Sequence, residues 1–245
     1  MDEHRYCSSL DIMPGGSSET ARGLARRAAL LNSAFWGRGA RLTVGFLEGS
    51  VALQRRVETI AQRWPSETNA DFSLEFWIEP PRNAAQANIR ISFQPDKGSW
   101  SVLGKYARET APSKATMNLG WMTTELDEEK ADAVVLHEFG HALGLIHEHL
   151  NPSQTIDWNE ENVRADLKRT QGWDDTTIEA NMFARPKPED VFATDVDALS
   201  IMMYPIPPSW TNNGYTTGFN SRLTDTDKSL IRAAYGARSP FGRTG

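Results

Sequence analysis

The alternation of apolar and polar residues predicts the elements of the first half of the chain. Continuous or alternating apolar runs bounded by Gly, Pro or Ser are typical of strands, and here they fall at 41–47, 73–79, 88–93 and 115–121. Ser50 is a good N-cap for a helix with apolar side chains at helical spacing, which we expect to close at Pro65. This order predicts a mixed sheet with a helix packed on it.

The second half is less regular and contains three predicted helices. Asp127 is a good N-cap for a helix that continues to Leu143, and a last helix is expected to begin at Thr224 and stop at Gly236. One further helix is expected at 160–169 within an irregular, polar stretch. The composition of residues 20–31 also favours a helix, after a polar N-terminal arm. The fold class is therefore α+β.

Candidate chemistry is concentrated in one segment, His137-Glu-Phe-Gly-His-Ala-Leu-Gly-Leu-Ile-His147. His137 and His141 are four residues apart, so they project from one face of a helix and can share one Zn²⁺. Glu138 is too close in sequence to ligate beside His137, but it can reach a water on the open side of the metal.

Gly144 is expected to end the helix and turn the chain back, since otherwise His147 would point away from the other two ligands. Three His ligands leave one tetrahedral position for water, the arrangement of a catalytic zinc. All five fixed letters of this motif arise by chance in such a chain with a probability on the order of 10⁻⁵, so we assign a zinc site.

Composition narrows the function classes. The chain has 245 residues and a net charge of −6, which argues against a nucleic-acid partner. No apolar run approaches the ~18 residues of a membrane span. Its single cysteine, Cys7, excludes an internal disulfide framework.

The zinc motif resembles that of the metzincin metallopeptidases at every fixed letter, and other residues resemble the astacins in particular. Glu148 follows the third His, and Ser200-Ile-Met-Met-Tyr204 resembles the astacin Met-turn, Ser-x-Met-x-Tyr. Residues 223–236 resemble the closing helix that astacins share with matrixins. Gly104-Lys105 resembles the entry to the strand at the upper rim of the cleft.

The resemblance implies a fold and a division of the chain. We expect a twisted, mixed five-stranded sheet with two long helices, an irregular C-terminal subdomain ending in a helix, and an active-site cleft between them. The expected parts are an N-terminal arm or pro-segment at 1–39, an N-terminal subdomain with the zinc helix at 40–147, and a C-terminal subdomain at 148–245.

The resemblance also implies roles for site residues. The metal ligands are His137, His141 and His147, and Glu138 is the general base and acid. Tyr204 is expected near the metal, as a ligand at rest or as a donor to the oxyanion; a core aromatic residue is the alternative. Met202 is expected to pack under the imidazoles, although a matrixin alignment leaves Met203 as the Met-turn residue.

Departures from the family leave several points open. Leu145 stands where astacins carry Phe, and His149 is expected to be a surface residue or to support the ligands. In astacins the residue equivalent to Glu148 pairs with the new N-terminus after propeptide removal; here a solvated Glu148 is equally expected. For Cys7 we favour an incidental thiol over a latency ligand of the zinc, and a latency role for Asp11 is fainter still.

The sequence thus predicts a monomeric zinc endopeptidase that acts on proteins or peptides. A zinc-dependent binding module without catalysis and an effector delivered into other cells are the alternatives. The loop 205–210 hints at an apolar specificity pocket. The N-terminus has no apolar leader, so we favour non-classical export, with a cytoplasmic location as the alternative.

Overall fold

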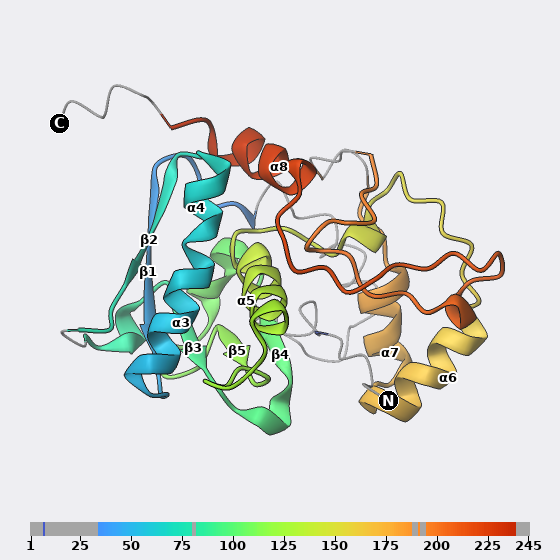
Figure 1. Cartoon of the computed structure of the whole chain (residues 1–245), viewed down its shortest axis with the longest axis horizontal. Coiled ribbons are helices and arrows are strands. Elements are labelled where there is room, and N and C mark those ends of the chain that lie inside the picture. Colours follow the sequence, from blue (N-terminus) through green and yellow to red (C-terminus); the bar gives the residue numbers. More distant parts are fainter. Residues whose placement is uncertain (1–6, 8–33, 80–81, 188–190, 192–194, 239–245) are drawn as a thin grey trace.

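The computed structural model describes residues 7, 34–79, 82–187, 191 and 195–238 (Figure 1). The helix expected at 20–31 and the arm before it, apart from Cys7, lie outside the described residues. Among the described residues, no helix combines the length and the apolar character needed to cross a bilayer.

A five-stranded sheet forms one layer of the molecule, with strand order β2-β1-β3-β5-β4. Its strands are β1 (Ala40–Phe46), β2 (Phe72–Phe76), β3 (Ile89–Ser92), β4 (Ser99–Ser101) and β5 (Met117–Leu119). The β1–β2, β1–β3 and β3–β5 pairs are parallel, whereas β4 runs antiparallel to β5 at the edge. The expectation of a mixed five-stranded sheet is confirmed.

The first helical segment differs from its prediction at one end. Helix α3 (Val51–Ala61) begins at Ser50, whose hydroxyl accepts from the Leu53 amide. It does not continue to Pro65. The helix is interrupted at Gln62, and a second helix, α4 (Arg63–Thr68), follows with Pro65 in its first turn. That prediction was wrong because a proline in a first turn removes no helical hydrogen bond.

Helix α5 (Glu128–Ala142) carries the zinc motif and packs against α3 and the strands β4 and β5 (Figure 1). Asp127 caps it, accepting from the amides of Glu129 and Lys130. The indole of Trp64, in α4, donates to the Leu136 carbonyl over 3.0 Å. Helix α5 is therefore held in the core by the sheet and by the helices α3 and α4.

The C-terminal part contains α6 (Glu160–Gln171), α7 (Asp175–Ile178) and the π-helical turn η6 (Glu179–Phe183), which lie across α5 from the sheet (Figure 1). The last helix, α8 (Asp225–Tyr235), returns to the first half and packs on α4. Short 3-10 turns complete the described fold: η2 (Ala84–Gln86), η3 (Pro95–Lys97), η4 (Gly104–Glu109), η5 (Glu148–Leu150) and η8 (Pro208–Trp210).

The edge of the sheet also differs from its prediction. Gly104-Lys105 opens the turn η4 and does not lead into a strand, and the edge strand is Ser99–Ser101 itself. The segment after η4 is held by the buried guanidinium of Arg90 on β3. Its nitrogens donate to main-chain carbonyls, which include those of Ala87, Thr110 and Lys114.

We predict that Arg90→Met lowers the free energy of unfolding by about 2–4 kcal/mol, because several buried carbonyls lose their donor together. Denaturant titration of the variant and the parent measures this difference. Arg55→Met is the matched control, since Arg55 lies on the surface of α3 in exposed ion pairs and its loss is expected to change little. Equal stability of the two variants would contradict the role given to Arg90.

Candidate metal centre

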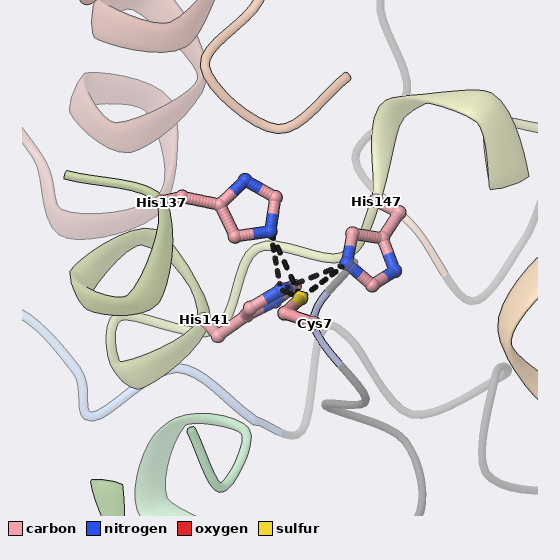
Figure 2. Close-up of side chains that lie close together, drawn as sticks. All are labelled: Cys7, His137, His141 and His147. Carbon is pink, nitrogen blue, oxygen red and sulfur yellow. Dashed lines mark hydrogen bonds between the residues drawn. The ribbon is translucent and has the colours of Figure 1, made fainter. Parts of the chain in front are cut away.

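Three imidazoles meet between α5 and the segment that follows it (Figure 2). His137 and His141 come from successive turns of α5, and their Nε2 atoms are 3.1 Å apart. His147 enters from the chain beyond the helix and brings its Nε2 to 3.1 Å from that of His141. His141 and His147 are fully buried. The structure thus brings together the three residues that the spacing predicted.

Hydrogen bonds at the other ring nitrogens fix two of these imidazoles. The Nδ1–H of His137 donates to the Ile201 carbonyl over 2.7 Å, and that of His141 donates to the Leu145 carbonyl over 2.8 Å. In a neutral imidazole, one nitrogen is a donor and the other an acceptor. Both Nε2 atoms therefore present lone pairs to the same point.

Burial keeps this cluster neutral. It lowers the pKa of His137 to about 4, and it lowers the pKa values of His141 and His147 well below their ordinary range. Lone pairs that converge in a buried space without protons need a cation between them. A tetrahedral zinc with Zn–N bonds of roughly 2.0–2.1 Å separates its nitrogens by about 3.3 Å, so the observed spacing fits this metal.

Gly144 makes the turn that the third ligand requires. Its φ of +103° lies in the left-handed region, which costs glycine little. Its amide donates to the His141 carbonyl and the Leu145 amide donates to the Gly140 carbonyl, so the helix closes within one turn. The same turn sends the Leu145 carbonyl back to His141.

Gly140 lets the Met-turn approach the zinc helix. A Cβ at this position would lie 2.4 Å from the Met202 sulfur and 3.3 Å from the Trp64 ring. Met202 is buried in the core cluster of α5, whereas Met203 belongs to the second cluster, around Trp210. Of the two methionines, Met202 thus packs beneath the helix.

Asp227 fixes the Met-turn from α8, a role that the sequence analysis missed. Its buried carboxylate accepts from the Ser200 hydroxyl at 2.6 Å and from the Ile201 amide at 3.0 Å. It also accepts from the Thr224 amide, which completes the capping box of α8. The Ile201 carbonyl accepts from His137. By holding the Ile201 amide, Asp227 therefore helps to fix the orientation of the His137 ring. The spacing Thr224-x-x-Asp227 is the sequence signal for the cap.

Glu138 lies in the core beside the imidazoles. Its side chain is 1% exposed, and its Oε2 has no hydrogen-bond partner among the described residues. Burial raises its pKa well above the ordinary value. Glu138 and His137 share a pocket whose apolar wall includes Trp121, Val134 and Phe219.

The expected pocket loop contributes less than predicted. Pro205 lines the pocket, but Ile206 and Trp210 are fully buried in the second core cluster. Of the loop 205–210, only Pro205 therefore contributes to the pocket wall, and the other described lining residues come from other parts of the chain.

Tyr204 is buried against the cluster, with its ring centroid 4.2 Å from that of His147. Its hydroxyl lies 3.8 Å from the Cys7 sulfur and donates to the Cys7 carbonyl. The aromatic residue after the Met-turn is therefore in reach of the space in which the three Nε2 atoms converge.

Cys7 occupies the fourth corner of this group, a position that the preference for an incidental thiol did not anticipate. Its Sγ lies 3.1 Å from the Nε2 of His137, 3.5 Å from that of His141 and 2.9 Å from that of His147 (Figure 2). The four donor atoms all lie within 4.8 Å of one another. A thiolate with three imidazoles is a closed zinc ligand set. Asp11, the fainter candidate, lies outside the described residues.

Glu148 is not a solvated surface residue. It is 8% exposed and accepts from the Asn151 side chain and the Asp197 amide, each over 3.2 Å. Burial raises its pKa to about 7. His149 is fully buried as well, behind His147, and its Nε2–H donates to the Asn181 carbonyl. Neither side chain belongs to the metal-binding group.

Comparisons with known proteins found one matching family and several similar solved structures. The family model described as Astacin, a family of peptidases, matches residues 52–236. One structure of myroilysin has a TM-score of 0.78 and 32% identity, and the match covers 84% of this chain and 98% of that one. For a crystal structure of myroilysin the TM-score is 0.63 and the identity 32%, with coverage of 83% and 86%. No curated protein sequence matches.

We predict that Gly140→Ala lowers the free energy of unfolding by about 1–3 kcal/mol, because the new methyl group would overlap the Met202 sulfur. Because Met202 must move, zinc affinity is expected to fall as well. Thermal unfolding and chelator competition measure the two effects. Gly218→Ala is the control, since a Cβ there meets nothing within 4 Å. A Gly140→Ala protein that matches this control would refute the close packing.

Proposed function

Because the chain belongs to the astacin family of metallopeptidases, we propose that it is a zinc endopeptidase in which Glu138 is the general base and acid. The observation that carries this proposal is the convergence of three imidazole lone pairs beside a buried carboxylate whose Oε2 has no hydrogen-bond partner among the described residues. Protein or peptide chains are the substrates that such a family implies.

When bound, zinc supplies Lewis-acid polarisation of a carbonyl and lowers the pKa of a water to about 7. The chain supplies the remaining functions. His137, His141 and His147 would hold the ion, and the rings of His137 and His141 are fixed by carbonyl acceptors. Glu138 accepts the proton of the attacking water at Oε2 and returns it to the leaving amine.

Tyr204 is proposed as the donor to the oxyanion that develops on the scissile carbonyl. Its hydroxyl already donates to a carbonyl oxygen next to the cluster, that of Cys7. A substrate carbonyl in that place would receive the same bond. Preorganised donors of this kind strengthen binding of the transition state relative to the ground state.

A zinc-dependent binding module is the competing function, and Glu138 argues against it. A buried carboxylate oxygen without a donor costs stability, and among the described residues the Oε2 of Glu138 has none. A module that only binds zinc would gain by replacing it. Retention of this group is consistent with catalysis.

We further propose that the full chain is a latent form, with residues 1–39 as a pro-segment. Cys7 would occupy the coordination position of a catalytic water, since a fourth protein ligand would close a tetrahedral zinc site. Tyr204 adds a hydrogen bond to the Cys7 carbonyl, so one residue of the arm is held at two points. Comparing the N-terminal sequence of the active enzyme with the translated start tests the pro-segment.

The pocket beside His137 and Glu138 supports a preference for uncharged, apolar substrate side chains. Trp121, Val134, Pro205 and Phe219 contribute to its wall. Among the described residues that line it, Glu138 is the one acidic side chain, and none is Lys or Arg. Sequencing the products of a peptide library would test this preference.

We predict that Glu138→Gln, in the activated enzyme, reduces peptide cleavage by about 10²–10⁴-fold through loss of the proton carrier. Zinc content should remain equal to that of the parent, because Glu138 is outside the ligand group. The measurements are a fluorogenic peptide assay and metal analysis of the same preparations. If Glu138→Gln retained zinc and cleaved peptides as fast as the parent, the proposed mechanism would be wrong.

Cys7 gives a second prediction, which concerns the full chain. In a Glu138→Gln background, which prevents self-cleavage, the thiol should resist alkylation while zinc is bound and react once a chelator removes the metal, because Sγ is a ligand and Cys7 is 4% exposed. Mass spectrometry after iodoacetamide treatment reads the modification. Rapid alkylation of the zinc-loaded chain would rule out the closed ligand set.

A further inference from the structure

His147 differs from the other two ligands in how its ring is held. His137 and His141 each donate Nδ1–H to a carbonyl. The Nδ1 of His147 is buried and has no acceptor among the described residues. Metal-binding imidazoles almost always use this nitrogen to fix their orientation. Within the part of the chain that the structure describes, an interaction other than this hydrogen bond therefore holds the plane of the His147 ring.

Ring contacts surround His147. The ring of His149 stacks on it, with centroids 5.3 Å apart and planes inclined by 19°. The Tyr204 ring lies 4.2 Å away at 52°, and the His141 ring meets it edge-on at 4.6 Å. Among the described residues, packing between rings is therefore the interaction that holds the His147 ring.

His149 is itself firmly anchored. Its Nε2–H donates to the Asn181 carbonyl over 2.8 Å, in the turn η6. The Asn181 side chain in turn donates to the Thr177 carbonyl in α7. The edge of the Trp158 ring meets the His149 ring at 6.1 Å and 82°. His149 is therefore fixed on the side away from the metal-binding group.

We propose that His149 is a positioning residue that sets the ring plane of His147 and confines the Tyr204 ring, whose centroid lies 4.6 Å from its own. It is not a ligand, because its Nε2 proton is committed to Asn181 and it stands outside the four-residue metal group. The inference rests on the proposed zinc site. It assigns to α7 and η6 the function of supporting the third ligand.

Two substitutions separate the ring from its hydrogen bond. His149→Phe keeps an aromatic ring stacked on His147 but removes the hydrogen bond to the Asn181 carbonyl. His149→Ala removes the ring and the hydrogen bond. We expect His149→Ala to weaken zinc binding by about 10–100-fold, the range for loss of a supporting partner. His149→Phe should stay within about threefold of the parent, because the stack remains.

The experiment uses the full chain with Glu138→Gln in every variant. Chelator competition gives zinc affinity at a temperature where all variants are folded, and the visible absorption of the Co²⁺-loaded chains reports ligand geometry. Leu167→Ala, a fully buried change in α6, is the control for lost stability alone. It should unfold at a lower temperature yet keep the parent's affinity and Co²⁺ spectrum.

The outcomes distinguish the hypotheses. Weaker zinc binding and an altered Co²⁺ spectrum in His149→Ala, with rescue by His149→Phe, support the positioning role. Equal losses in His149→Phe and His149→Ala, or an equal loss in Leu167→Ala, would overturn it, as would parent-like behaviour of His149→Ala. A parent chain that binds no zinc would instead overturn the proposed function.

Discussion

The structure depends on one electrostatic constraint: three neutral imidazole nitrogens are held about one tetrahedral edge apart in a buried space. Each neighbouring element satisfies part of this constraint. Helix α5 supplies two nitrogens, the Gly144 turn brings the third, and the Ile201 and Leu145 carbonyls fix the proton positions on the first two. The Met-turn and α8 support this arrangement from below through Met202 and Asp227. The fold can therefore be understood as a frame built around a cation.

Local spacing was sufficient to predict much of this frame. The periodicity from Asp127 onward placed His137 and His141 on one helix, and a glycine three residues later located the turn. Both follow from helix geometry alone. The cap of α8 at Thr224 was recognisable for the same reason. The mixed sheet was predicted, although β2, β3 and β5 are shorter than the apolar runs suggested.

Features that depend on distant contacts escaped the sequence. Cys7 meets His137 across 130 positions, and Asp227 reaches Ile201 across 26. The sequence next to Cys7 or Asp227 contains no pattern that predicts these contacts. Pro65 was misread because its effect depends on where a helix restarts, and the fold decides that restart. The burial of His149 follows from the packing of η6, which has no simple sequence pattern.

The position of Asp227 near the end of the described chain has a consequence for biosynthesis. A ribosome delivers His137, His141 and His147 well before it delivers the residue that secures the Ile201 main chain. Until α8 has emerged and docked, the acceptor for His137 is not secured from that side. Cys7, by contrast, precedes all three histidines in the chain and is made before them. A growing polypeptide thus contains the thiol that we propose as the fourth ligand before α8 can support the metal centre.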